Sequence, residues 1–326
     1  MLNNSFLLPS FDFENEIILE KPNPFIIANT VEMKLQEMQS RHIIPVFVKD
    51  NEPVISHQDF IQATLEVLSY VYKSSTPSTP MIRVSHPIKG RIPDAKDKPA
   101  KELEEHEKTL YYERMAFIIE IPTITDSING NNLTLTVGGI KAYNLDNLYN
   151  RKGAEEHFKV FIGFQNKVCT NLCISTDGLK ADLKVRSINE LMKQMYQLFI
   201  NYNLTNHLNE MSSMQDYYLS ESQFASLIGR SRLYQHLPAN FKRSLPLLQF
   251  GDNQIGIIAK DYYKDDSFCR AEDGSINIWK VFNLFTGANK QSYIDTFLDR
   301  GLNAYTFTKQ LQSGLNHDRS HNWFLS

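Results

Sequence analysis

The sequence predicts an α+β fold, in which a mostly antiparallel sheet with helices is followed by a helix-rich C-terminal part. Short runs rich in β-branched and aromatic residues, separated by Asn, Gly and Asp, are typical of antiparallel strands. These runs lie at 110–122, 132–139, 157–164 and 167–175. After Gly178 the spacing of apolar residues changes to that of amphipathic helices. Because strands come first and helices later, alternating βαβ units are not expected.

Three parts are expected along the chain. Residues 1–25 form an extended N-terminal arm, because prolines break regular structure there. Residues 26–186 form the α+β, sheet-forming part, and residues 187–326 form a helix-rich part that packs on the same core. No repeat of fixed period divides the chain further.

The first half is expected to contain two helices and an early strand besides the sheet. A first helix is placed at Asn29, which has capping-box spacing to Glu32. The β-rich run at 43–50 predicts a strand. A second helix follows Ser56, which together with Asp59 again has the pattern of a cap.

Three helices and one hairpin are expected in the second half. Ser187, with Glu190 after it, caps the first of these helices. The runs 220–237 and 275–287 have helical apolar spacing and predict the other two. Between them, the run 247–263 contains Gly-Asp-Asn, which predicts a hairpin.

The overall charge limits what kind of partner surface the protein can have. The 326 residues include 34 Lys and Arg against 37 Asp and Glu, which gives a net charge of −3. A protein whose whole surface follows a phosphate backbone would be strongly basic. Any nucleic-acid site is therefore expected to be a local basic patch.

Cysteine usage and hydropathy predict a cytoplasmic protein without membrane contact. The three cysteines are odd in number and lack framework spacing, as expected in a reducing compartment. The N-terminal residues lack the basic and continuous apolar regions of a signal peptide. No apolar run approaches the ~18 residues that a membrane helix needs.

Strong catalytic motifs are missing from the sequence. There is no G-x-x-x-x-G-K-[ST] phosphate loop, no G-x-G-x-x-G opening a helix, no G-x-S-x-G elbow and no H-E-x-x-H. Gly138-Gly139 follows a strand but lacks the pattern of a dinucleotide site. No cofactor is therefore expected, and a non-enzymatic protein is favoured over an enzyme with an unrecognised site.

Neither of two pairs of potential metal ligands in the sequence predicts a metal site. Cys169 and Cys173 in "KVCTNLCIST" would lie ~13 Å apart on one face of a strand, too far to share a zinc ion or a disulfide. They are expected to pack around Asn171. His317 and His321 would share one face of a helix, but the polar residues between them form a poor helix and no third ligand is identifiable.

Basic residues beside aromatic rings occur in two stretches, 83–101 and 228–244. Cations neutralise phosphates and rings stack on unpaired bases, so this combination suits single-stranded nucleic acid. The alternative is that the first stretch is a solvated loop and the second a helix and loop whose rings belong to the core. The candidate nucleic-acid-binding residues are Lys89, Arg91, Arg230, Arg232, Tyr234, Phe241, Lys242 and Arg243.

Four long strings carry a resemblance to a known family. They are "VSHPIKGRIPDAKDKPA", "EHEKTLYYERMAFIIEIP", "HFKVFIGFQNKVCTNLCISTDG" and "IWKVFNLFTGANKQSYIDTFLDR". Together they resemble an uncharacterised Bacteroidales family that is known only as a domain of unknown function and is associated with plasmids and conjugative elements. The likeness extends from about Ile43 to Tyr305 and implies a mobile-element setting without implying an activity.

A more distant likeness links two motifs to phage and plasmid-like proteins. "FIGFQNKVCTNL" is similar to their Val-Cys-x-Asn strand, and "INIWKVFNLFTGA" to their Trp-x-x-x-Asn-Ala-x-Thr helix, although Leu284-Phe285 stands where that pattern has alanine. The matching residues are Cys169, Asn171, Trp279, Asn283 and Thr286. The likeness implies a structural polar cluster of Asn171, Trp279 and Asn283, in which Asn171 joins sheet to helix by hydrogen bonds.

Two functions from different classes are consistent with the sequence. The first is a non-enzymatic mobile-element protein that binds or anneals single-stranded DNA or RNA. The alternative is a protein-interaction module that regulates or inhibits host machinery, with host or element-encoded proteins as partners, acting through the N-terminal arm and a mobile surface loop at 92–107. Whether the two basic stretches converge in space separates these functions.

Overall fold

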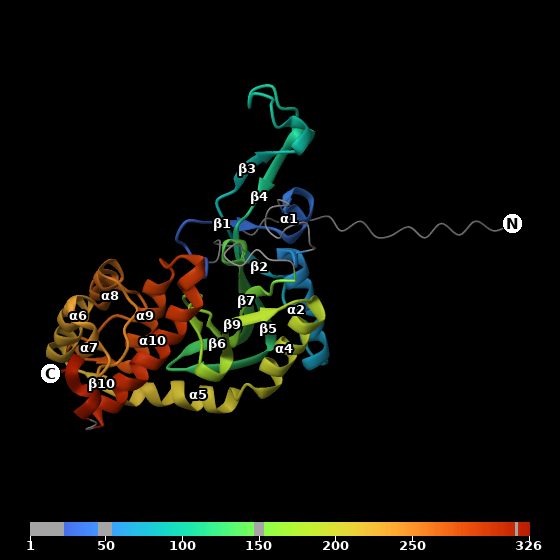
Figure 1. Ribbon diagram of the computed structural model, residues 1–326. Helices are drawn as coiled ribbons and strands as arrows, with labels where there is room; N and C mark the ends of the chain where they lie inside the picture. The colour runs from blue at the N-terminus through green and yellow to red at the C-terminus, as the bar shows by residue number, and fades with distance from the viewer. Residues whose placement is uncertain (1–22, 45–53, 147–152, 317–318) are drawn as a thin grey trace, which may run out of the picture.

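A computed structural model describes residues 23–44, 54–146, 153–316 and 319–326, with side chains given from residue 322 onward in the last of these ranges (Figure 1). The strand expected at 43–50 and the arm expected at 1–25 fall largely outside the described residues. His317 lies outside them too, and the side chain of His321 is not described.

A seven-stranded antiparallel sheet forms the centre of the molecule. Its order is β1-β2-β5-β6-β7-β8, and β9 also pairs with β7. The strands are β1 (Thr30–Met33), β2 (Met81–Ser85), β5 (Arg114–Ile128), β6 (Asn131–Ala142), β7 (Glu156–Asn166), β8 (Leu172–Cys173) and β9 (Leu179–Val185). Two short sheets stand apart from it. They are β3 (Ile88–Arg91) with β4 (Lys108–Tyr111), and β10 (Tyr218–Leu219) with β11 (Ile276–Asn277).

Helices precede, cover and follow the sheet. They are α1 (Leu35–Arg41), α2 (His57–Val71), α3 (Tyr143–Asp146), α4 (Ile188–Asn201), α5 (Leu204–Ser213), α6 (Glu221–His236), α7 (Ala239–Lys242), α8 (Asp252–Lys264), α9 (Ile278–Asn289) and α10 (Ile294–Leu315). The α+β fold expected from the sequence is confirmed, with the later helices gathered at one side of the sheet (Figure 1).

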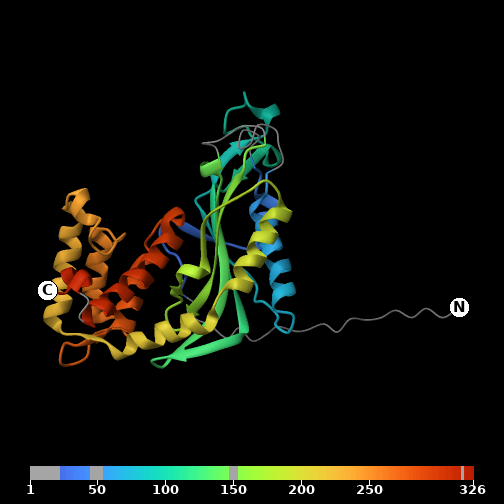
Figure 2. The ribbon, with the colours of Figure 1, turned by 60° about the horizontal axis from the view of Figure 1, so that its bottom comes forward.

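Alternating side chains of β5 pack against helices on opposite faces of the sheet. Phe117 belongs to the larger core cluster, where its ring meets that of Phe60 of α2 at 5.0 Å. Ile118 belongs to a second cluster with Phe297 of α10. Figure 2 shows α2 and α4 on one side of the sheet and α10 on the other. A Cβ at Gly139 would lie 2.4 Å from Phe60, so only glycine lets α2 approach this closely.

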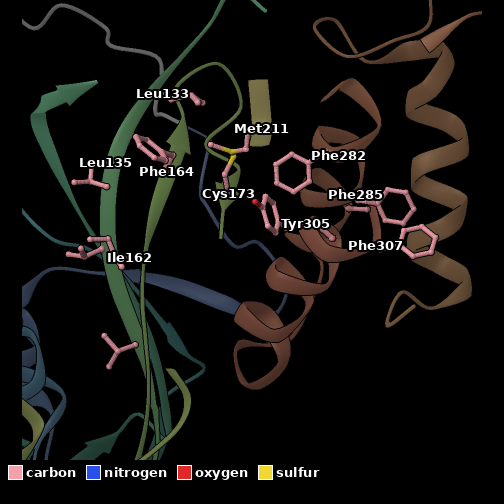
Figure 3. Packing of buried hydrophobic residues seen from close by; sticks show 14 of the residues in the cluster. Leu133, Leu135, Ile162, Phe164, Cys173, Met211, Phe282, Phe285, Tyr305 and Phe307 are labelled. Atoms are coloured by element: carbon pink, nitrogen blue, oxygen red, sulfur yellow. The ribbon is translucent and has the colours of Figure 1, made fainter. Parts of the chain in front are cut away.

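The helical part shares the larger core with the sheet. Phe164 and Cys173 of the sheet, Met211 of α5 and Tyr305 of α10 belong to one cluster of buried residues, and Phe282 of α9 continues it (Figure 3). Continuous burial of this kind gives the two parts a common source of hydrophobic stabilisation.

Helix starts were the best predicted local features. Ser56 and Asp59 form the expected capping box at α2, and the Ser187 side chain accepts from the Glu190 amide at α4. The helices expected within 220–237 and 275–287 are present as α6 and α9. In each cap a side-chain oxygen satisfies an amide that the first helical turn leaves free.

The first helix was placed wrongly. Asn29 has a φ of 47° and precedes strand β1, in which Val31 pairs with Val84 of β2. The helix α1 begins only at Leu35. The capping-box spacing was present, but pairing with the sheet edge outweighed it.

The hairpin expected at 247–263 was also wrong, because the segment contains helix α8. Gly251 is its N-cap residue, and the Gly251 amide donates to the side-chain oxygen of Gln254 at 3.1 Å. Ile255, Ile258 and Tyr262 are buried at helical spacing.

The segment containing Cys169 and Cys173 is not one strand. β7 ends at Asn166, a turn follows with Thr170 at a φ of 57°, and β8 contains only Leu172 and Cys173. Both thiols are free, and burial raises the pKa of Cys169 to about 11 and that of Cys173 well above its ordinary value.

Candidate nucleic-acid interface

The first basic stretch forms a hairpin that projects from the body of the molecule (Figure 1). Strands β3 and β4 pair with Arg91 opposite Lys108, and the Ile92 amide donates to the Glu107 carbonyl at 2.9 Å where the connecting loop begins and ends. All four residues of β3 are exposed. The polar loop expected at 92–107 therefore joins two strands and contains 3-10 turns at 93–95 and 105–107.

A groove of about 740 Å³ lies where this hairpin meets the end of α1. Its lining includes four cationic residues and one carboxylate, and the remaining lining is mainly apolar or small. The charged residues are Arg41, Lys89, Arg91, Lys108 and Glu105. The apolar residues are Ile43, Ala100, Leu103 and Leu110. We call this hollow the basic groove.

Two of the four cations of the basic groove form ion pairs on the surface. Arg41 pairs with Glu37 at 2.9 Å and Lys108 with Glu105 at 2.5 Å, and both pairs are exposed. The hydrogen bond from Lys108 holds the pKa of Glu105 below its ordinary value. Exposed ion pairs contribute little to stability, so an incoming anion can displace them.

The other two cations of the basic groove have no carboxylate partner. Arg91 donates to the backbone carbonyl of Lys98. The ammonium group of Lys89 has no ion pair or hydrogen bond to any residue that the structure describes. These two predicted residues are the side chains most available to a phosphate.

The second basic stretch lies on α6 and α7, where three of its four cations already have partners. Arg230 stacks on the Trp323 ring at 5.1 Å, and Arg232 pairs with Asp252 at 3.2 Å. Lys242 donates to the Gln235 carbonyl at 2.9 Å. These contacts are internal to the helical part.

The two rings predicted to stack on bases have opposite environments. Tyr234 is only 4% exposed and packs against Phe324, so its ring cannot meet a base. Phe241 is 58% exposed, and Arg243 beside it is exposed as well. Tyr234 is therefore a core residue, as the alternative interpretation of this stretch held.

The two basic stretches do not form one surface, which counts against a nucleic-acid site built from both of them, so any such site has to be formed around the first stretch alone. Figures 1 and 2 both place the hairpin at one end of the sheet and α6 at the far side of the helical part. Lys89 and Arg91 instead lie with Arg41 and Lys108 in the basic groove. The sequence did not single out Arg41 or Lys108, because they come from segments far apart in the chain and carry no local motif.

The polar cluster at the junction of sheet and helix is present. Asn171 donates to the Asn283 carbonyl at 3.0 Å, and the Asn283 side chain accepts from Asn166 at 3.0 Å and donates to the Trp279 carbonyl at 2.9 Å. The Trp279 indole donates to Asn131 at 2.8 Å. These bonds fix α9 to the sheet.

A buried ionic cluster was missed from the sequence. Lys141 of β6 is fully buried, with its Nζ 2.6 Å from Asp146 and 2.9 Å from Glu156. It also lies over the Phe158 ring at 4.1 Å. The one available signal was a lysine inside the otherwise apolar end of a strand.

The described part of the chain contains neither a cluster of metal ligands nor a helix that could span a membrane. There, no three His, Cys, Asp or Glu side chains are grouped so that they could hold a metal ion. None of the helices seen there is both long enough and apolar enough to cross a membrane.

Comparison with known proteins identifies the family of the chain. Residues 13–325 match the model of a family described as a domain of unknown function, B. Theta gene description (DUF3871). The match spans nearly the whole chain, so the protein belongs to this family. No curated protein and no solved structure matches the chain.

Proposed function

We propose that the protein is a non-enzymatic factor that binds or anneals single-stranded nucleic acid, using the basic groove. The observation that carries this proposal is the convergence of Arg41, Lys89, Arg91 and Lys108 on one hollow with a single carboxylate among its lining residues. Cations gathered in a groove bind a phosphate backbone without reading sequence.

The lining of the groove sets the expected binding properties. It contains no aromatic ring, so bases gain apolar contact with Ile43, Leu103 and Leu110 instead of stacking. Affinity then depends mainly on phosphate contacts and falls with salt. We expect micromolar binding with little preference among bases.

The proposal includes a biological setting. The resemblance to a family associated with plasmids and conjugative elements supports a role in a mobile element, where single strands are exchanged. The free thiols of Cys169, Cys173 and Cys269 support action in a reducing compartment such as the cytoplasm.

Fluorescence anisotropy with a labelled oligothymidylate, over a series of salt concentrations, tests the proposal. Four phosphate contacts predict a slope of roughly −3 in log K against log salt, because each contact to a single strand contributes about −0.7. The K89Q/R91Q/K108Q variant should weaken binding at least tenfold and flatten the slope. Absence of salt-dependent binding at micromolar protein would refute the proposal.

A matched control uses the second basic stretch. The R230Q/R232Q/K242Q/R243Q variant removes more charge, but from α6 and α7. It should leave binding nearly unchanged. If this variant lost affinity and the hairpin variant kept it, the site would lie on α6 and α7 and the basic groove would be wrong.

One observation favours the protein-interaction alternative at a different surface. Leu233, Phe241 and Leu247 are 61%, 58% and 57% exposed on and after α6 and α7, beside Arg232 and Arg243. Large apolar and Arg side chains together are common at interfaces. An L233S/F241S variant should lose any co-purifying partner while keeping its oligothymidylate affinity; retention of the partner would exclude this surface.

A further inference from the structure

The N-terminal segment, residues 1–22, has a composition opposite to that of the basic groove. It contains four carboxylates against one lysine. It also contains apolar residues throughout, among them alternating Phe11 and Phe13. The carboxylates are Asp12, Glu14, Glu16 and Glu20.

The alternation of aromatic and acidic residues in this segment matches the apolar and cationic lining of the basic groove. In an extended chain Phe11 and Phe13 point to one face, and Asp12 and Glu14 to the other. The groove offers apolar Ile43, Leu103 and Leu110 together with cations from α1, β3 and β4. Rings on the apolar lining and carboxylates on the cations would satisfy both sets of groups.

The segment is long enough to reach the groove. The described chain begins at Asn23, whose carbonyl accepts from the Thr170 hydroxyl at 2.7 Å. From this fixed point 22 extended residues span up to roughly 70 Å. An extended segment of 22 residues can therefore reach well beyond the sheet edge near Asn23.

We propose that residues 1–22 bind in the basic groove and compete there with nucleic acid. Competition rests on the proposed function, whereas the docking itself does not. The groove is favoured over the basic face of α6 and α7 because four cations and the apolar side chains of Ile43, Leu103 and Leu110 line one hollow there. At the groove, the ammonium group of Lys89 has no partner among the described residues.

The first experiment tests docking without nucleic acid. The photoreactive amino acid p-benzoylphenylalanine replaces Phe13 in the full chain, and cross-linked peptides of the monomeric product are mapped by mass spectrometry. Cross-links to Ile43, Leu103 or Leu110 are expected. Cross-links to Leu233, Phe241 or Leu247, cross-links between two copies, or no cross-link would overturn the proposal.

The second experiment tests competition. The D12N/E14Q/E16Q/E20Q variant of the full chain should bind labelled oligothymidylate about fivefold more tightly or better, which is a typical size for coupling between two ligands. The gain should shrink at high salt, because salt screens the segment from the groove. Equal affinity of variant and native protein at low salt would overturn the competition.

A matched control separates docking from net charge. The D126N/D216N/D266N/E272Q variant neutralises the same number of carboxylates at exposed positions outside the basic groove. It should change affinity less than twofold, and a gain as large as that of the N-terminal variant would overturn the proposal. If Phe13 cross-links to the groove and no variant binds oligothymidylate, docking stands and the proposed function fails.

Discussion

Lys89 and Lys141 show two opposite uses of the same side chain in the sheet-forming part of the molecule. Lys89 is exposed on β3, and no described residue pairs with its ammonium group. Lys141 is fully buried on β6 between Asp146 and Glu156. The buried charge is committed to the fold, because removing one member of a buried ion pair is strongly destabilising. The exposed charge costs the fold nothing and is free for a ligand.

The surroundings of Lys141 explain why its cluster is structural. Glu156 also accepts from the Ile55 amide, at 3.1 Å, just before α2 begins. Asp146 accepts from the His157 amide at 2.8 Å. The cluster therefore ties together the start of α2, the helix α3 and two neighbouring strands.

The largest expected effect comes from breaking this cluster. A K141M variant leaves Asp146 and Glu156 without their cation, and removal of one partner of a buried ion pair costs about 3 to 5 kcal/mol. Urea denaturation, followed by circular dichroism, should show this loss in the free energy of unfolding.

A triple variant sharpens the first prediction. K141M/D146N/E156Q removes the two carboxylate charges together with the lysine, so it should be more stable than K141M alone. If K141M were as stable as the native protein, the cluster would contribute nothing to the fold and the contrast with Lys89 would fail.

A pH effect of about 3 kcal/mol is expected from a second buried group, His207. Burial lowers its pKa to about 4 from 6.5, and each unit corresponds to about 1.4 kcal/mol. The unfolded chain takes up a proton near pH 6.5, whereas folded His207 stays neutral until about pH 4. Stability is therefore complete above pH 6.5 and is lost as the pH falls towards 4.

Urea titrations between pH 7.5 and 4 measure this loss. An H207Q variant loses the Tyr202 contact at 2.6 Å and starts less stable, but it should decline less steeply below pH 6.5. Buried His42 and His57, whose pKa values burial also lowers, should keep part of the decline in that variant. Equal steepness in both proteins would show that His207 does not contribute.

A smaller loss, about 2 kcal/mol, is expected at the junction of sheet and helix. An N283L variant keeps the branching at Cγ but removes the acceptor of the Asn166 side chain, and an unsatisfied buried donor costs about 1 to 3 kcal/mol. Thermal unfolding measures it. The control N201L, at the exposed C-terminal end of α4, should be nearly neutral, and equal stability of both variants would show that the junction bonds are dispensable.

Local patterns predicted those parts of the fold that local contacts determine. Ser56 and Ser187 cap helices through bonds to residues three positions later, which the sequence displays directly. Asn29 has the same spacing, yet strand pairing with β2 decides its surroundings. The Gly-Asp-Asn of α8 was assigned to a turn although Ile255 and Ile258 carried the helical period. In both errors a short motif predicted the wrong element. At Asn29 the pairing of β1 with β2 determined the structure, and at α8 the helical spacing of apolar residues did.

The candidate site was less predictable because it is assembled from separate segments. Lys89 and Arg91 were identified, but Arg41 on α1 and Lys108 on β4 join them only once the hairpin folds back. Tyr234 was assigned to stacking because sequence proximity to Arg232 does not show which way a helical side chain points. Asn171 was predicted better, since two matched motifs indicated both ends of its contact.

The smallest expected change in stability comes from the exposed lysine. A K89Q variant should unfold within about 0.5 kcal/mol of the native protein, as surface substitutions generally do. Its oligothymidylate binding should nonetheless weaken, with a salt slope reduced by about 0.7 for one lost phosphate contact. Thermal unfolding and anisotropy on the same sample measure both quantities. A destabilisation comparable to that of K141M would mean that Lys89 makes contacts that stabilise the fold. Its ammonium group would then not be free to bind a phosphate.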